Sequence, residues 1–159
     1  YILEMKKWRT IIMSDLHLGA RQSQTTKIID FLEKNDSEIL ILNGDIIDGW
    51  ALKSGGKWKK DSSKVFRRFM KRSENGTKVI YIRGNHDDFL KPFVPFKMNN
   101  IEIVRKYVHT GIDGSHVDFQ NKILAFCDFT TVPYSEPEVA TDLQGHGKEP
   151  HRARRCGGG

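Results

Sequence analysis

Three short polar segments carry side chains that could bind metal ions and act on a phosphate group. The segments are Ser14-Asp15-Leu16-His17, Gly44-Asp45-Ile46-Ile47-Asp48 and Gly84-Asn85-His86-Asp87. Carboxylate and amide oxygens bind hard divalent cations, and imidazole shifts the preference toward Mn, Fe or Zn. A site with this mixture of ligands could hold two ions, clamp a phosphoryl oxygen and lower the pKa of a bridging water.

The segments divide into ligands for two ions. We expect Asp15 and His17 to bind one ion together, because side chains two positions apart on an extended strand end project to the same side. Asp45 has two carboxylate oxygens and could bridge this ion to a second one. Asn85 would bind the second ion through a neutral carbonyl oxygen, which adds no further negative charge.

Other residues of the segments are expected to support the chemistry. His86 directly follows a predicted ligand, so its ring would turn toward the substrate and hydrogen-bond a phosphate oxygen or protonate the leaving group. Asp87 could orient that imidazole, and Asp48 would support the ligands from behind. Gly44 and Gly84 would permit the tight turns that bring the backbone close to the ions.

Each segment also has a purely structural interpretation. An Asp-x-His pair at a strand end can be a cap, Asp45 and Asp48 could cap the turn that follows them, and Gly-Asn-His-Asp is a common kind of turn sequence. The coincidence of three segments, each with ligand types suited to one binuclear site, favours metal binding over three separate explanations.

The segments each follow an apolar run that reads as a buried strand. These runs are Thr10–Met13, Ile39–Leu42 and Val79–Ile82, and helical periodicity indicates helices between them over Gln22–Asn35 and Asp61–Asn75. Strand, helix, strand, helix, strand implies a right-handed βαβαβ unit with a parallel sheet, which is an α/β fold. The three segments would then meet at the carboxyl edge of the sheet, where ligands bind in such folds.

The rest of the chain gives weaker signals. The aromatic segment Phe89–Phe96 holds two prolines and is predicted to be a loop or a short broken helix, Ile101–Val104 and Lys122–Phe126 are predicted strands, and Asp113-Gly114 is a turn signal. We therefore expect one domain over residues 1–130 and a poorly ordered, basic, glycine-rich tail over residues 131–159.

Composition is that of a globular protein with an excess of positive charge. The 159 residues are 38% hydrophobic and carry a formal net charge of +6, so an anionic partner is expected. No apolar run approaches the roughly 20 residues that cross a bilayer, and no signal-peptide core is visible. The two cysteines do not form a close metal-binding pair, which fits a reducing cytoplasm.

The three segments resemble a known family. SDLHLGA (14–20), LNGDIIDGW (42–50) and YIRGNHDDFL (81–90) are similar to the calcineurin-like metallophosphoesterases, and more narrowly to their UDP-2,3-diacylglucosamine pyrophosphatase-like branch, over about residues 8–114. The resemblance implies an α/β sandwich in which Asp15 and His17 bind the first metal, Asp45 bridges, Asn85 binds the second and His86 contacts the phosphate. It also implies hydrolysis of a pyrophosphate bond in a nucleotide-linked glycolipid at the cytoplasmic face of the inner membrane, usually with Mn²⁺.

The second half of the chain departs from the family pattern. The family adds a His-Gly-Asp element and a later Gly-His-x-His element, whereas this chain has His-Val-Asp-Phe at 116–119 and Gly-His-Gly-Lys at 145–148. His116 and His146 are therefore the candidates for the remaining ligands. We expect a largely missing second strand layer, a weakly held second ion and weak turnover.

Two other functions stay open at this stage. The missing histidines are consistent with a catalytically silent protein that uses the fold for binding. The basic helix at 64–72 is consistent with a nuclease or nucleic-acid-binding role, which we favour less. Trp50, Leu52, Trp58 and the 89–96 segment could flank an acyl-chain groove and give peripheral membrane contact.

Overall fold

The computed structural model describes residues 5–120 and 129–133 of the chain. Six strands form the main sheet in the order β4-β5-β3-β2-β1-β8. The parallel strands are β1 (Lys6–Met13), β2 (Asn35–Asn43), β3 (Lys78–Ile82) and β5 (Ile101–Val104), and the antiparallel edge strands are β4 (Phe96–Met98) and β8 (Phe129–Pro133). The predicted α/β class with a parallel sheet is confirmed.

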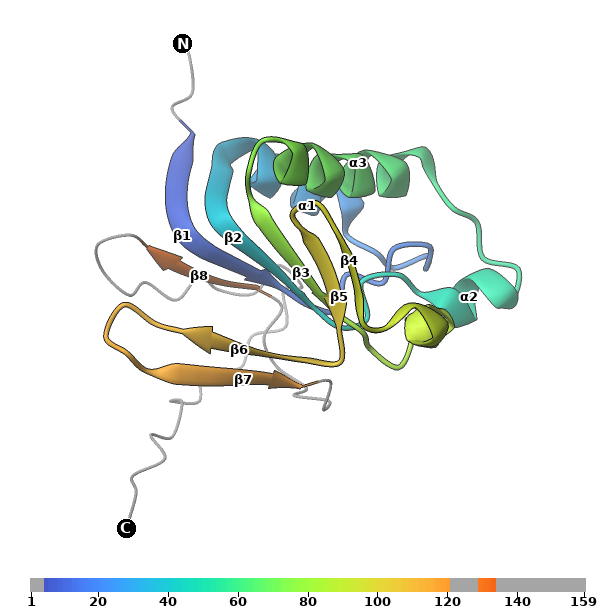
Figure 1. The fold of residues 1–159 in the computed structure, drawn as a ribbon. Coiled ribbons are helices and arrows are strands. Elements are labelled where there is room, and N and C mark those ends of the chain that lie inside the picture. Colours follow the sequence, from blue (N-terminus) through green and yellow to red (C-terminus); the bar gives the residue numbers. More distant parts are fainter. Residues whose placement is uncertain (1–4, 121–128, 134–159) are drawn as a thin grey trace, which may run out of the picture.

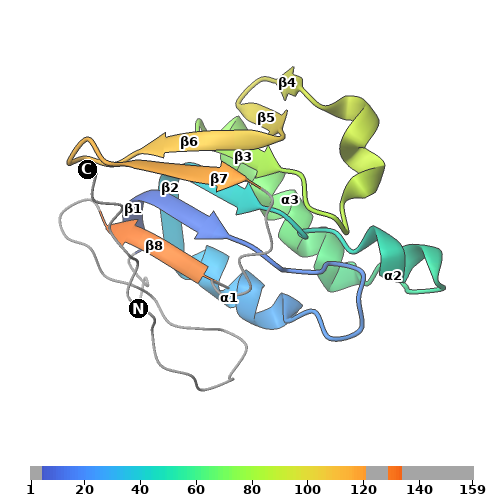
Figure 2. The same cartoon turned by 90° about the horizontal axis from the view of Figure 1, so that it is seen from below.

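Two layers flank this sheet. Helices α1 (Thr25–Lys34) and α3 (Lys60–Glu74) cover one face, while β6 (Lys106–Thr110) and β7 (His116–Gln120) form a small antiparallel sheet on the other face (Figures 1 and 2). The second strand layer therefore has two strands within the described part of the chain. A two-stranded ribbon gains stability by packing on a larger sheet.

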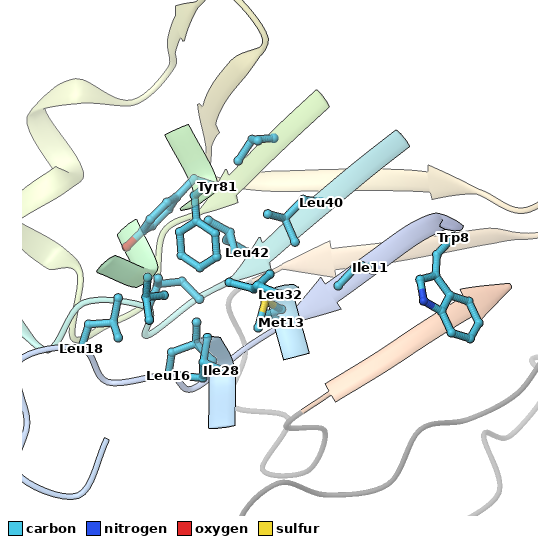
Figure 3. Packing of buried hydrophobic residues seen from close by; sticks show 14 residues of the cluster. Trp8, Ile11, Met13, Leu16, Leu18, Ile28, Leu32, Leu40, Leu42 and Tyr81 are labelled. Carbon is cyan, nitrogen blue, oxygen red and sulfur yellow. The ribbon is translucent and has the colours of Figure 1, made fainter. Parts of the chain in front are cut away.

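The apolar runs are continuous because the central strands are covered on both faces. On the helical side, Leu40 and Leu42 of β2 join a buried cluster with Ile28, Leu32 and Phe69 (Figure 3). On the other side, a second cluster faces β6 and β7 and consists of Ile41, Ile80 and Ile82, with Tyr107 and Phe119 packed against it. Successive side chains of a strand alternate between these two clusters.

The boundaries of the two long helices lie close to those predicted. α1 begins after Gln24 without a side-chain cap, because the Ser23 hydroxyl donates a hydrogen bond to the Leu16 carbonyl instead (2.7 Å). α3 ends at Glu74, and Gly76 follows in a left-handed conformation with φ +100°. Gly76 thus takes the conformation that commonly ends a helix.

Several short elements were not predicted from the sequence. They are α2 (Gly49–Lys53), β4, β6, β7 and β8. The aromatic segment forms the 3-10 helix η1 (Asp88–Phe93), with Pro92 inside it, as the prediction of a short broken helix allowed.

The last described element of the chain is β8, which ends at Pro133 and pairs with β1. The division into a domain over residues 1–130 and a tail over residues 131–159 stays a prediction. The predicted strand Lys122–Phe126 and residues 134–159 lie outside the described residues. No helix in the described part of the chain is long and apolar enough to cross a membrane.

Candidate metal centre

Backbone hydrogen bonds join the three loops that leave the carboxyl ends of β1, β2 and β3. The amides of Asp15 and His17 donate to the carbonyls of Gly44 (3.2 Å) and Asp45 (2.9 Å), and the amide of Gly44 donates to the Ile82 carbonyl (2.9 Å). The parallel order of the strands thus brings together segments about 30 and 40 residues apart in sequence. The predicted convergence of the polar segments is present in the structure.

Asp15, His17 and Asp45 form a compact cluster of possible metal ligands. One ligand atom from each lies within 4.8 Å of the others, and all three residues are half-buried. Their φ angles are +53°, +46° and +53°. Such left-handed conformations are uncommon outside glycine and are maintained by the surrounding structure, often at functional sites.

Glycine at position 84 allows the third loop to approach Asp45. A Cβ on Gly84 would lie 2.2 Å from the Asp45 Oδ1 atom and 2.3 Å from its backbone nitrogen, which no side chain can tolerate. The same Oδ1 atom accepts a hydrogen bond from the His86 amide at 2.8 Å. One carboxylate oxygen of Asp45 therefore fixes the third loop, while the remaining lone pairs of the carboxylate stay available to ions.

Asp48 lies between two histidine rings. Its Oδ2 atom is 3.2 Å from His17 Nδ1 in a hydrogen bond, and its Oδ1 atom is 3.0 Å from His86 Nδ1. The second contact has the distance of an ion pair without the angles of a hydrogen bond, so among the described residues His86 Nδ1 has no hydrogen-bond partner. Burial raises the pKa of Asp48, but His86, the Ala51 amide and His17 together hold the pKa below its ordinary value.

This arrangement selects one nitrogen of His17 for a metal. Nδ1 faces Asp48, so Nε2 is directed to the cluster, 4.0 Å from Asp15 Oδ1. A carboxylate behind a ligating imidazole fixes its tautomer and ring orientation. Asp48 therefore lies where the predicted supporting residue is required, and it also accepts the Ala51 amide (2.8 Å) at the start of α2.

His86 is held by rings on two sides. Its ring centroid lies 4.3 Å from that of Trp50 and 4.6 Å from that of His17, with the second pair edge to face. Trp50 is 52% exposed, so the indole also faces solvent beside the site. Sequence reasoning assigned Trp50 to an apolar groove and missed its contact with His86, although its position two residues after Asp48 was a signal.

Asp87 does not orient His86, contrary to expectation. It is completely buried, and its carboxylate accepts hydrogen bonds from the amides of Ile46 (3.2 Å), Ile47 (2.8 Å) and Gly84 (3.3 Å) and from the Tyr81 hydroxyl (2.7 Å). The reason is that these four donors hold the Asp87 carboxylate against the second loop and Tyr81. Asp87 ties the second and third loops together, and Asp48 is the carboxylate beside His86.

The remaining predicted ligands occupy different places. Asn85 is half-buried in the turn between Gly84 and His86, next to Asp45. His116 is the first residue of β7, at the β6–β7 turn, which lies at the far end of the small sheet from α2 (Figures 1 and 2). Its Nδ1 atom is 3.1 Å from the Thr110 hydroxyl, and it belongs to neither ligand cluster of the described residues. His146 lies outside them.

The donor set fits a divalent ion at the first position. Two carboxylates and an imidazole with a free Nε2 are suited to Mn, Fe or Zn. For a second ion, the described residues offer the Asp45 carboxylate, the Asn85 carbonyl oxygen and the group of His17, Asp48 and His86, whose ligand atoms also lie within 4.8 Å of one another. The identity of the metal is not determined by this donor set.

Comparison with known proteins identifies the family of this chain. The search of curated proteins gave no match. Among solved structures, the crystal structure of the nuclease MPE from Pseudomonas putida is similar, with 23% sequence identity and a TM-score of 0.40. The match covers 60% of this chain and 46% of the nuclease chain. This chain therefore spans less than half of that protein's length. The sequence matches the calcineurin-like phosphoesterase family over residues 9–146. The chain belongs to the calcineurin-like phosphoesterase family.

Proposed function

We propose that this protein is a metal-dependent hydrolase of phosphoester or pyrophosphate bonds. The observation that carries the proposal is the cluster of Asp15, His17 and Asp45, three residues from two loops with left-handed backbones and ligand atoms within 4.8 Å. Membership of a family whose members typically use two metal ions supports it. In this proposal Asp15 and His17 hold one ion, Asn85 holds the second and Asp45 bridges them.

The residues around the ions have separate tasks. Bound divalent ions supply Lewis acidity and a water of lowered pKa. Asp48 orients His17 through Nδ1. His86 has Nδ1 on the side of Asp48, so Nε2 is the nitrogen that contacts a phosphate oxygen or donates a proton to the leaving group. Trp50 against the His86 ring limits rotation of the imidazole.

The finer proposal concerns the substrate. The motifs around the site are similar to those of the UDP-2,3-diacylglucosamine pyrophosphatase branch, which suggests a nucleotide-linked glycolipid, Mn²⁺ and a place at the inner surface of the cytoplasmic membrane. Exposed aromatic rings on α2 and η1 support an apolar substrate portion, because Trp50, Phe89 and Phe93 are 52%, 40% and 57% exposed. Exposed apolar groups gathered beside a polar site are typical of ligand surfaces.

The test is release of nucleoside monophosphate from UDP-2,3-diacylglucosamine with Mn²⁺, with bis-p-nitrophenyl phosphate and an oligonucleotide as parallel substrates. Asp45→Ala should abolish hydrolysis. Asp30→Ala, which removes an exposed carboxylate on α1, is the matched control and should leave it unchanged. Hydrolysis that persists in Asp45→Ala under chelation would refute the proposal, and cleavage of the oligonucleotide alone would refute the glycolipid.

A catalytically silent binding protein is the second candidate. It is favoured by the ligand supply, since His116 belongs to neither ligand cluster of the described residues and His146 lies outside them. Metal stoichiometry separates the two candidates. Two bound ions per chain, with turnover, support the hydrolase, whereas a single tightly bound ion without turnover on any of the three substrates supports the silent protein.

A further inference from the structure

A cavity of about 470 Å³ lies in the helical layer, between α1 and α3. Its walls include Met5 just before β1 and Asp36 near the start of β2. These positions are at the amino ends of the strands, whereas the candidate metal centre is at the carboxyl ends. The cavity is thus separate from the metal centre.

Cationic side chains dominate the lining of this cavity. Four cations lie on the exposed or half-exposed surface of α3 and a fifth is buried; they are Lys64, Arg67, Arg68, Lys71 and Arg72. Two carboxylates, those of Glu33 and Asp36, also line the cavity. The net charge of the lining is therefore +3. Positive charge concentrated in a concave surface with low-dielectric walls attracts anions more strongly than the same charge on a flat surface.

Both carboxylates are already paired with arginines. Arg72 is buried and donates to Asp36 Oδ1 at 2.6 Å, to the Leu32 carbonyl at 2.7 Å and to the Asn35 carbonyl. Arg68 forms an ion pair with Glu33. These contacts fix the two arginines at the wall, so the acids no longer oppose a bound anion with their full charge.

The remaining cations are available to a ligand. Lys64 contacts Asp61 at 2.8 Å, but both side chains are more than 40% exposed, and such surface pairs contribute little. Arg67 and Lys71 make no ion pair within the described residues. Lys64, Arg67 and Lys71 share one face of α3 and span about 10 Å along its axis.

We propose that this cavity binds a small anion that carries several linked phosphate groups, of about the size of a nucleoside triphosphate. Its volume lies in the usual range of small-molecule sites, and the row of cations is long enough for consecutive phosphates. The compact size of the site favours a small anion over a nucleic acid or a bilayer surface, both of which would extend well beyond it. The site would serve recognition or regulation, not the hydrolysis proposed above.

The test measures binding of inorganic tripolyphosphate by titration calorimetry, in buffer with EDTA so that the metal centre holds no ion. Arg67→Glu with Lys71→Glu should weaken binding at least tenfold, because two charge-assisted contacts become repulsive. Arg105→Glu with Lys106→Glu, on the opposite side of the main sheet, makes the same change in net charge at two exposed cations and should have no effect. Circular dichroism checks folding, and Arg67→Ala with Lys71→Ala replaces the first variant if it unfolds.

Two results support the proposal and three overturn it. Tenfold weakening confined to the α3 variant, and unchanged binding in Asp45→Asn, support it and show independence from the metal centre. The proposal is overturned by absence of binding, by equal weakening in the α3 variant and its control, or by binding of an oligonucleotide or anionic vesicles without tripolyphosphate. None of these results bears on hydrolysis by the metal centre.

Discussion

Replacement of Asp87 by alanine should destabilise the fold severely, although Asp87 belongs to the polar segment that predicted catalysis. Its buried carboxylate accepts four hydrogen bonds, three from backbone amides of two loops and one from the Tyr81 hydroxyl. Alanine would leave all four donors without this acceptor. Burial raises the pKa of Asp87, against the hydrogen bonds from Tyr81 and the three amides, which lower it.

The expected size of the effect follows from these donors. A buried donor without a partner costs about 1–3 kcal/mol, and water that enters the space left by the carboxylate satisfies some of the four. We expect a loss of about 3–5 kcal/mol, against a total stability of about 5–15 kcal/mol for a domain. The neighbouring Asp88 provides a matched control, because its carboxylate is 60% exposed and, within the described residues, its ion pair is with Arg83. Asp88→Ala should cost less than about 1 kcal/mol.

Urea unfolding followed by circular dichroism measures both variants. Asp87→Ala should lower the midpoint strongly at an unchanged slope, which indicates a change in stability and not in the unfolding reaction. If Asp87→Ala and Asp88→Ala lose the same small amount, the four hydrogen bonds do not hold the loops together. An intact fold with lost hydrolysis would instead restore the prediction that Asp87 orients His86.

Three further predictions concern the metal centre and the second sheet. Asp48→Asn should weaken metal binding about 10- to 100-fold, as loss of a carboxylate behind a ligating histidine does. A competition assay with a fluorescent chelator would detect this change. Unchanged affinity would mean that the contact with His17 has no role in metal binding. Gly84→Ala should reduce metal affinity and lower the stability of the fold by about 1–3 kcal/mol, because the added Cβ would lie 2.2 Å from Asp45 Oδ1. Chelator competition and urea unfolding measure the two effects. Wild-type values in both assays would contradict the close approach. Burial and the nearby Arg9 lower the pKa of His109 below 6.5, so the unfolded chain binds the extra proton first and stability should fall as the pH drops below about 6.5. His109→Gln should remove part of this pH dependence. If the urea midpoint changes with pH to the same extent in both proteins, His109 is not the cause of the dependence.

Much of the fold could be predicted because local signals and burial agree. The apolar runs of β1, β2 and β3 are continuous since both faces of these strands are covered, and the helical periodicity of α3 matches its buried Val65 and Phe69. The β6–β7 ribbon gave no comparable signal. Most residues of the two strands are exposed, and Tyr107 and Phe119 pack on the main sheet. Two strands with so few buried apolar residues lack the alternating hydrophobic pattern that predicts a strand.

The convergence of the polar segments was predicted from the sequence, but the contacts that join them were not. Spacing along one strand end was sufficient to associate Asp15 with His17, because that geometry is local. The assignment of Asp87 to His86 used the same kind of adjacency and was wrong in the structure. The decisive contacts join residues far apart in the sequence, Asp48 with His17 and Asp87 with Ile47. A single sequence does not show which side chains of neighbouring loops will meet.

The backbone of the centre shows that the protein itself holds the ligands in position. Three left-handed residues cost about 1–2 kcal/mol each relative to relaxed conformations, and an isolated loop would abandon them. The cost is offset by hydrogen bonds between loops, from Asp15 and His17 to the second loop and from the His86 amide to Asp45, together with the buried carboxylate of Asp87. These contacts involve only protein groups. In the proposed function, metal affinity should therefore respond to changes in the loops that never touch an ion, and Asp87, which is not among the predicted ligands, supports the site by joining its loops.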